Sequence, residues 1–270
     1  MMKNRFDQHI HSSFSYDADP ECAIGRMAGA AVAKGLAGIA ITDHLDPLWP
    51  VDGDTNFLDV TAYEKALAVA EGEWAGRIRF AKGVEVGLMP GECLSICEAV
   101  VNGYPYDFVI GAVHSTPTIP IDLRPFIEGR EMRDVIDEYY TLFLECVKAY
   151  KNYDVLGHIN VVDRYTDGYA PDSLYMPYID EMLKAAVADG KGLEVNTSSF
   201  RYGIGDRGTP TLPILRRFRE LGGEIVTIGS DAHRVCDVGS FIEAGEELLR
   251  SAGFRYIAVF KERRPEFVKL

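Results

Sequence analysis

Short apolar segments rich in β-branched residues alternate with longer segments of helical periodicity along the whole chain. This alternation indicates parallel strands joined by helical crossovers, in about seven units. The expected strands are Phe6–Ile10, Ala37–Thr42, Ile78–Val84, Phe108–Val113, Val155–Gly157, Gly192–Val195 and Ile225–Ile228, with a candidate eighth at Tyr256–Phe260. The expected helices are Pro20–Lys34, Thr61–Ala75, Glu92–Val101, Arg130–Tyr150, Leu174–Asp189, Leu212–Leu221 and Phe241–Ser251. The pattern predicts an α/β fold.

Length and composition agree with this fold. The chain has 270 residues, 47% of them hydrophobic and 26% charged, which is the size of one (β/α) barrel and the composition of a globular protein. No change in composition and no linker divides the series, so we expect residues 1–270 to form a single domain. No segment is apolar over the roughly 20 residues that a membrane span needs, and the first residues are charged, so we expect neither a membrane span nor a signal sequence.

The charge balance narrows the classes of partner. The chain carries 41 acidic and 28 basic residues, a net charge of −13. This balance disfavours nucleic acid, whose affinity comes mainly from clustered Lys and Arg, but leaves a small phosphate compound open. The five cysteines, Cys22, Cys93, Cys97, Cys146 and Cys236, are an odd and scattered set. They are typical of free thiols in a reducing compartment, so we expect a cytoplasmic protein. Cys93 and Cys97 lack a second ligand pair and are interpreted as core thiols.

All six histidines of the chain follow or end predicted strands. They are His9, His11, His44, His114, His158 and His233. A single histidine is more often structural than a ligand. In a parallel barrel, however, the carboxyl ends of all strands meet at one face, which carries the active site. We therefore expect the six imidazoles to converge.

Carboxylates occur at the same strand ends. They are Asp7, Asp17, Asp43, Glu85, Glu194 and Asp231. Histidine combined with carboxylate is the ligand set of Zn, Mn or Fe. His9 and His11 lie two apart on a strand, so both side chains point the same way and can reach one ion. Glu85 can bridge two ions, an arrangement that clamps a phosphoryl group and activates a water.

These residues resemble the motifs of the polymerase-and-histidinol-phosphatase (PHP) superfamily. The motifs are Asp7-Gln8-His9-Ile10-His11, Thr42-Asp43-His44, Gly83-Val84-Glu85, His114, Gly157-His158 and Gly229-Ser230-Asp231-Ala232-His233. The resemblance implies a distorted (β/α)7 TIM-like barrel with three divalent metal ions at the carboxyl ends of its strands. It implies one ion held by His9, His11, Glu85 and Asp231, a second by Glu85, His114 and His158, and a third by Asp17, His44 and His233. Many members have histidine in place of Asp17. Asp7 and Asp43 are expected to orient ligand imidazoles.

Within the superfamily, the length and the segments Ser12–Asp17, Asn196-Thr197-Ser198 and Ile228–His233 are most similar to free-standing histidinol-phosphate phosphatases. Arg164 and Arg201 suit a phosphate monoester, because guanidinium binds phosphate with two prongs. A surface charge or an ion pair is their structural alternative. With Glu85 and Asp231, these arginines are the residues we expect to act in catalysis.

Two further segments bear on the choice of ligand. Gly203–Gly208 has the letters of a dinucleotide fingerprint, but it does not lead from a strand directly into a helix, so an active-site loop is favoured. Leu45–Asp59 is a long connection whose Trp49, Asp52, Asp54 and Phe57 could receive a cationic amino-alcohol; plain tethering is the alternative.

The sequence thus predicts a metal-dependent hydrolase of small phosphomonoesters. Histidinol phosphate is the substrate that the resemblance implies, and histidine biosynthesis the pathway. Asp43 and Asp163 are candidates for the acid that protonates the leaving alkoxide. Three alternatives stay open: a phosphodiesterase or exonuclease of the same superfamily, a protein-tyrosine phosphatase, and a metal-binding module without turnover.

Overall fold

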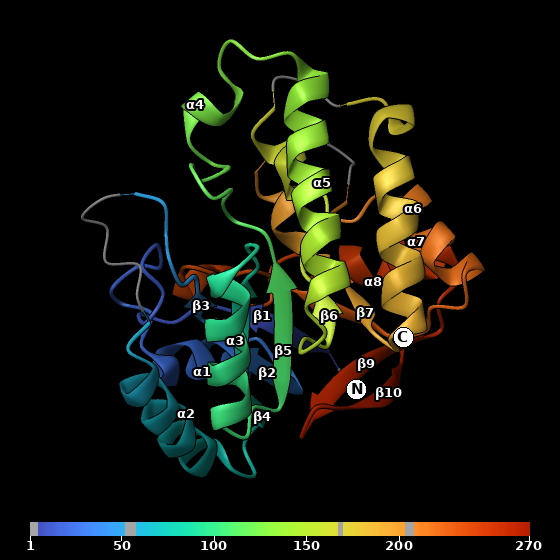
Figure 1. The fold of residues 1–270 in the computed structure, drawn as a ribbon. Coiled ribbons are helices and arrows are strands. Elements are labelled where there is room, and N and C mark those ends of the chain that lie inside the picture. The colour runs from blue at the N-terminus through green and yellow to red at the C-terminus, as the bar shows by residue number, and fades with distance from the viewer. Residues whose placement is uncertain (1–4, 52–57, 167–169, 203–207) are drawn as a thin grey trace.

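A computed structural model describes residues 5–51, 58–166, 170–202 and 208–270 (Figure 1). Its strands are β1 Phe6–Ile10, β2 Gly38–Ile41, β3 His44–Leu45, β4 Arg79–Gly87, β5 Phe108–Ala112, β6 Val155–Leu156, β7 Gly192–Asn196, β8 Val226–Gly229, β9 Tyr256–Lys261 and β10 Arg264–Lys269. Its α-helices are α1 Ile24–Ala33, α2 Val60–Trp74, α3 Glu92–Gly103, α4 Arg124–Ile127, α5 Met132–Ala149, α6 Asp172–Ala188, α7 Leu212–Glu220 and α8 Ile242–Ala252. The elements predicted from the sequence are present, with ends shifted by a few residues.

The strands form a nearly closed parallel barrel. Their order is β1-β2-β4-β5-β6-β7-β8, and β3 pairs with the upper part of β4. The ring closes between the ends of β8 and β1, where the Asp231 amide donates to the His9 carbonyl at 2.8 Å and the His11 amide donates to the Ala232 carbonyl at 3.0 Å. The predicted seven-stranded barrel is confirmed, and its carboxyl ends meet at one face.

The third predicted strand is longer than its sequence pattern indicates. We expected it to end at Val84 with Glu85 beyond it, but β4 continues to Gly87. The reason is β3, because His44 and Leu45 pair with Glu85 and Val86 and prolong the ladder. Glu85 therefore projects from the middle of a hydrogen-bonded strand, which holds its backbone more firmly than a loop would.

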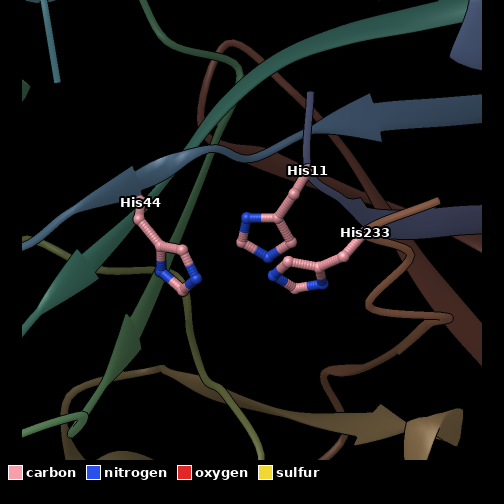
Figure 2. A group of neighbouring side chains, drawn as sticks. All are labelled: His11, His44 and His233. Carbon is pink, nitrogen blue, oxygen red and sulfur yellow. The ribbon is translucent and has the colours of Figure 1, made fainter. Parts of the chain in front are cut away.

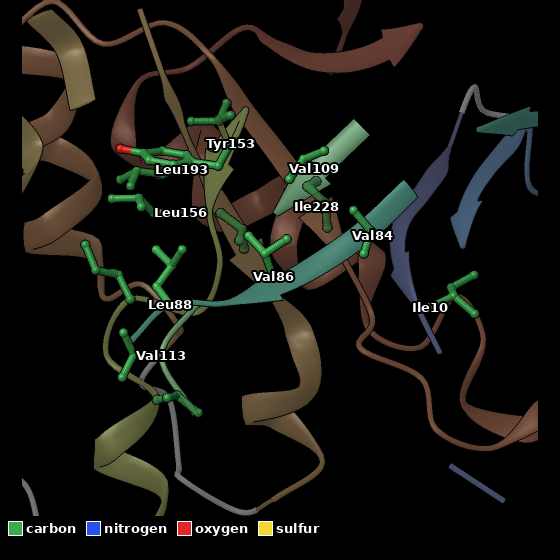
Figure 3. Close-up of a cluster of buried hydrophobic side chains, with 14 of the residues drawn as sticks. Ile10, Val84, Val86, Leu88, Val109, Val113, Tyr153, Leu156, Leu193 and Ile228 are labelled. Carbon is green, nitrogen blue, oxygen red and sulfur yellow. The ribbon is translucent and has the colours of Figure 1, made fainter. Parts of the chain in front are cut away.

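Side chains alternate along β4 between the barrel interior and the helical layer. Val84 and Val86 are buried in the large hydrophobic cluster that also contains Leu88, Val109 and Leu156 (Figure 3). Since successive residues of a strand point to opposite faces, Glu85 is left facing the interior. The outer helices bury their apolar faces on this cluster and so fix the strand register.

The C-terminal strands close the other end of the barrel. The candidate eighth strand at Tyr256–Phe260 is present as β9, but it pairs antiparallel with β10 in a separate two-stranded sheet and does not join the barrel. Phe260 of β9 stacks on Phe108 with ring centroids 4.9 Å apart, and the Gln8 amide donates to the Ala258 carbonyl at 2.8 Å. The hairpin thus covers the end of the barrel opposite the carboxyl ends of its strands (Figure 1).

The cysteines form no disulfide and four of them are buried. The thiols of Cys93 and Cys97 lie 3.3 and 3.8 Å from the Gly87 carbonyl oxygen, as expected of core thiols. Among the described helices, none combines the length and the apolar character that crossing a bilayer would require.

Candidate metal centre

Three histidines from distant parts of the chain turn their rings toward one another at the carboxyl face (Figure 2). His11 follows β1, His44 begins β3, and His233 follows β8. The ring centroid of His11 lies 4.2 Å from that of His44 and 4.0 Å from that of His233. Contacts this close between basic rings are expected where a cation or a proton is shared among them.

Glu85 lies at the centre of the imidazoles and is completely buried. Its Oε1 atom is 2.9 Å from Nε2 of His158 and 3.4 Å from Nε2 of His114. Its Oε2 atom is 3.1 Å from Nδ1 of His44, 3.2 Å from Nε2 of His9 and 3.4 Å from Nε2 of His11. The two oxygens therefore face two different sets of nitrogens, which is the geometry that a bridging carboxylate needs.

The nine side chains predicted to hold metal are brought together. His9, His11 and Asp231 form one group of potential ligand atoms, and Glu85, His114 and His158 form another. Asp17 completes a third set, with its carboxylate 3.6 Å from Nε2 of His44 and 3.1 Å from Nε2 of His233. A group that the sequence did not indicate consists of His44, Asp46 and His114.

The donor atoms of this centre fit a bound cation. Glu85 Oε2, His114 Nε2 and His233 Nε2 are buried and have ionic neighbours at 3.1–3.4 Å, but none of the three forms a hydrogen bond of good geometry. A buried polar atom left without any partner costs about 1–3 kcal/mol, and an ionic neighbour offsets part of that cost. Carboxylate oxygens and imidazole nitrogens are the preferred ligands of Zn, Mn and Fe, so coordination would satisfy all of these atoms at once.

The carboxylates control protonation of the imidazoles. Burial lowers the pKa of His9, but the nearby Glu194 and Glu85 outweigh burial and raise it well above the ordinary value. Burial also lowers the pKa of His114, but the carboxylates of Asp46 and Glu85 outweigh it and raise the pKa to about 10. His11 has the opposite balance, because burial and the neighbouring histidines lower its pKa. Without metal, protons therefore occupy part of the centre, and metal ions must displace them.

Three polar side chains orient the imidazoles from behind. Glu194 lies 2.5 Å from Nδ1 of His9, and Asp46 lies 2.8 Å from Nδ1 of His114. The Ser15 hydroxyl lies 2.9 Å from Nδ1 of His11. Such contacts select the tautomer that presents Nε2 to the centre.

Asp7 and Asp43 do not contact imidazoles through their carboxylates, contrary to expectation. Asp7 accepts hydrogen bonds from the amide and hydroxyl of Ser230 and from the Gly239 amide. Asp43 accepts from the amide and hydroxyl of Ser12 and from the Ser15 hydroxyl. Asp7 lies near the start of β1 and Asp43 lies between β2 and β3, and both carboxylates bond to groups of the connecting segments. Each carboxylate thus holds a loop, and Asp43 reaches His11 only through Ser15.

Arg201 is tied to the loop that carries Asp231. Its two terminal nitrogens donate to the carbonyls of Ser230 at 2.5 Å and Asp231 at 2.7 Å. Asp231 has φ of 54°, a left-handed conformation that side chains other than glycine adopt at a cost. The Arg201 contacts therefore hold the strained backbone of Asp231 in place. The sequence predicted a phosphate-binding role and did not indicate this one.

Arg164 lines a recess of about 80 Å³ together with His44, His158 and Asp231. Its guanidinium donates to the Ser198 hydroxyl at 2.6 Å, lies 3.7 Å from the Asp231 carboxylate and lies 4.1 Å from the ring centre of Tyr202. The recess is also lined by Tyr16, Asp17, Trp49, Ile121, Asp122 and Tyr165. Neither Asp43 nor Asp163, the candidate acids, is among the described residues that line it.

Comparison with known proteins places this geometry in a family. The model of the PHP domain matches residues 7–198. The chain belongs to the PHP domain family. A probable histidinol-phosphatase of Clostridium acetobutylicum is 30% identical over 96% of this chain and 97% of its own length. A histidinol-phosphatase of Lactococcus lactis is 29% identical over 95% and 94%.

A solved structure resembles this PHP chain throughout. It is the histidinol phosphate phosphatase of Lactococcus lactis in complex with Zn, L-histidinol and phosphate, with a TM-score of 0.86 and 26% identity over 97% of this chain and 99% of that one. The family and fold predictions are confirmed. The fingerprint-like glycines from 203 to 207 and the loop residues from 52 to 57 lie outside the described residues.

Asp46 is the clearest site residue that the sequence analysis missed, although a signal was present. It follows His44 by two positions, so a strand at this point places both side chains on the same side. The carboxylate at Glu194 was noticed, but its place behind His9 depends on packing between β7 and β1. For Asp122, loop geometry alone brings the side chain to the recess.

Proposed function

We propose that this protein is a metal-dependent phosphomonoesterase that hydrolyses L-histidinol phosphate to L-histidinol and phosphate. The observation that carries the proposal is Glu85, whose two oxygens face separate sets of imidazoles beside an arginine-lined recess. The relatives support it, because histidinol-phosphatases match this chain nearly from end to end. Histidine biosynthesis follows as the pathway.

The chain's own side chains supply the sites for the ions. We propose that His9, His11, Glu85 and Asp231 hold one ion, that Glu85, His114 and His158 hold a second, and that Asp17, His44 and His233 hold a third. Bound divalent ions in such a site neutralise phosphoryl oxygens and lower the pKa of a water. Zn, Mn and Fe all suit these ligands.

Several residues act on the phosphate and on the geometry around it. Arg164 is placed to donate N–H groups to phosphate oxygens in the recess, where such charge-assisted hydrogen bonds are strong. Arg201 remains a proposed second phosphate ligand, but we propose that its first task is to hold Asp231 through the carbonyl contacts. Glu194 and Asp46 fix the rings of His9 and His114. The fully buried position of Glu85 keeps its charge out of water and strengthens its interactions.

A substrate panel tests the proposal. Metal-free protein is reconstituted with Zn, Mn or Fe and assayed for phosphate release from histidinol phosphate, phosphotyrosine and a generic aryl phosphate, and for cleavage of an aryl phosphodiester and a short DNA. We expect the highest kcat/KM for histidinol phosphate and loss of activity on chelation. Preference for a diester would favour the nuclease alternative, and metal binding without any turnover would favour a binding module. A cytoplasmic location stays a prediction that rests on the free thiols.

A further inference from the structure

One carboxylate of the recess, Asp122, has no side-chain partner among the residues that the structure describes. Asp122 follows β5 in the loop that also carries His114, and it lines the recess at its solvent-exposed edge. Among the described side chains, none donates a hydrogen bond to it or forms an ion pair with it; only its own backbone amide does. The other carboxylates that line the recess, Asp17 and Asp231, lie against imidazoles of the metal centre.

Asp122 nevertheless lies near residues of the proposed metal centre. Its charge interacts with His114 and Asp17, and also with the hydroxyls of Tyr16 and Tyr165. Burial raises the pKa of Asp122, and the Asp17 carboxylate acts in the same direction. A carboxylate that is partly removed from water and lacks a cation is a site that a cationic ligand would satisfy. Asp122 does not belong to any group of described residues placed to share a metal ion.

The walls beside Asp122 are aromatic. Tyr16 stacks on His44 with ring centroids 5.2 Å apart and contacts Trp49 at 5.5 Å. Tyr165, Ile121 and Val161 add to the apolar lining. Flat aromatic walls suit a heteroaromatic ring and also attract an ammonium group. The recess therefore carries a positive charge at Arg164 and a negative charge at Asp122.

We propose that Asp122 is a specificity-determining residue that accepts a hydrogen bond from the ammonium group of the substrate alcohol. The inference rests on the proposed function, since it concerns how that same site selects an amino-alcohol phosphate. In histidinol phosphate the ammonium is two carbons from the ester oxygen, so a carboxylate in the same recess as the metal centre can receive it. Tyr16 and Trp49 then face the imidazole part of the substrate.

A pair of substrates that differ only in the ammonium group tests this role. Wild type, Asp122→Asn and Asp122→Glu are assayed with histidinol phosphate and with 3-(imidazol-4-yl)propyl phosphate, which has the same kind of leaving alcohol. We expect Asp122→Asn to lower kcat/KM for histidinol phosphate by about 10- to 100-fold, mostly through KM, as the loss of a charge-assisted hydrogen bond predicts. The kcat/KM for the analogue, which lacks the ammonium group, should change less than about twofold. Asp122→Glu should restore part of the selectivity.

Asp134→Asn is the matched control, because Asp134 is an exposed carboxylate at the start of α5, away from the recess residues. Metal content and melting temperature should be unchanged in all variants. An equal loss on both substrates would overturn the inference in favour of a role in the chemical step. If Asp122→Asn prefers histidinol phosphate over the analogue as strongly as wild type does, the inference is overturned and the proposed function still stands. Wild type that hydrolyses neither compound would overturn both.

Discussion

Replacing Glu85 by glutamine tests the centre most directly. Five imidazole nitrogens lie within 3.4 Å of the two carboxylate oxygens, and the carboxylate has no contact with solvent. Glutamine keeps the size but removes the charge and places an NH2 donor where an acceptor or ligand is needed. Removing one partner from a buried charge pair costs about 3–5 kcal/mol, which corresponds to roughly 10²- to 10⁴-fold in kcat/KM.

The assay measures kcat/KM for histidinol phosphate and metal content per chain on the same preparations. We expect Glu85→Gln to lose metal as well as activity, because two of the proposed ions share this residue. Glu71→Gln is the control: Glu71 pairs with Lys261 at 2.8 Å and Lys82 at 3.0 Å on the surface, where an ion pair is worth less than about 1 kcal/mol. Turnover of Glu85→Gln within about threefold of wild type, under ~1 kcal/mol, would refute the bridging role.

Other perturbations separate the remaining roles. Arg164→Ala should lower kcat/KM by about 10- to 100-fold at unchanged metal content, with partial rescue by lysine, as kinetics and metal analysis would show. Arg201→Ala should instead weaken metal binding in calorimetric titration, and unchanged affinity would contradict its hold on Asp231. Asp46→Asn should reduce metal affinity by about 10- to 100-fold. The melting temperature of the metal-free protein, measured by scanning calorimetry, should fall as the pH rises from 6.5 toward 10. The folded protein raises the pKa of His114 to about 10, so the stability that comes from its protonation is lost as the pH rises through that value. Metal-loaded protein should not show this loss, since metal replaces the protons.

The barrel was predictable because parallel strands are covered on both faces and read as continuous apolar runs. The hairpin strand β10 was missed, since most of its side chains are exposed and it contains Pro265. Its turn also lacks the usual signal. Glu262 and Arg263 both have positive φ, of 49° and 61°, where Asn-Gly is the common sequence. A two-residue strand such as β3 has no periodicity to recognise.

The convergence of the proposed metal ligands was predictable for a different reason. Strand order brings the carboxyl ends together whatever the loops do, so residue type and position after a strand were sufficient. Asp122 and the carbonyl contacts of Arg201 depend on how individual loops fold back over the face, whereas Asp46 had a signal in its spacing from His44. No periodic pattern describes a loop, and the direction of a guanidinium is set by tertiary contacts.

The metal-free centre has unfavourable features, among them the strained backbone of Asp231, and bound metal should stabilise the fold. A left-handed residue of this kind costs of order 1–3 kcal/mol, and each buried ligand atom without a hydrogen bond adds a similar amount. The surrounding barrel must supply that stability, since Asp231 accepts a hydrogen bond from Asn196 and its backbone is held by Arg201. Metal binds only the folded arrangement, so at 100 times its dissociation constant a single ion adds about 2.7 kcal/mol to the free energy of unfolding. Removing the metal should therefore lower the free energy of unfolding by a measurable amount, because the buried donor atoms lose their bound ion. An accidental cluster of charges that binds no metal would show no such change.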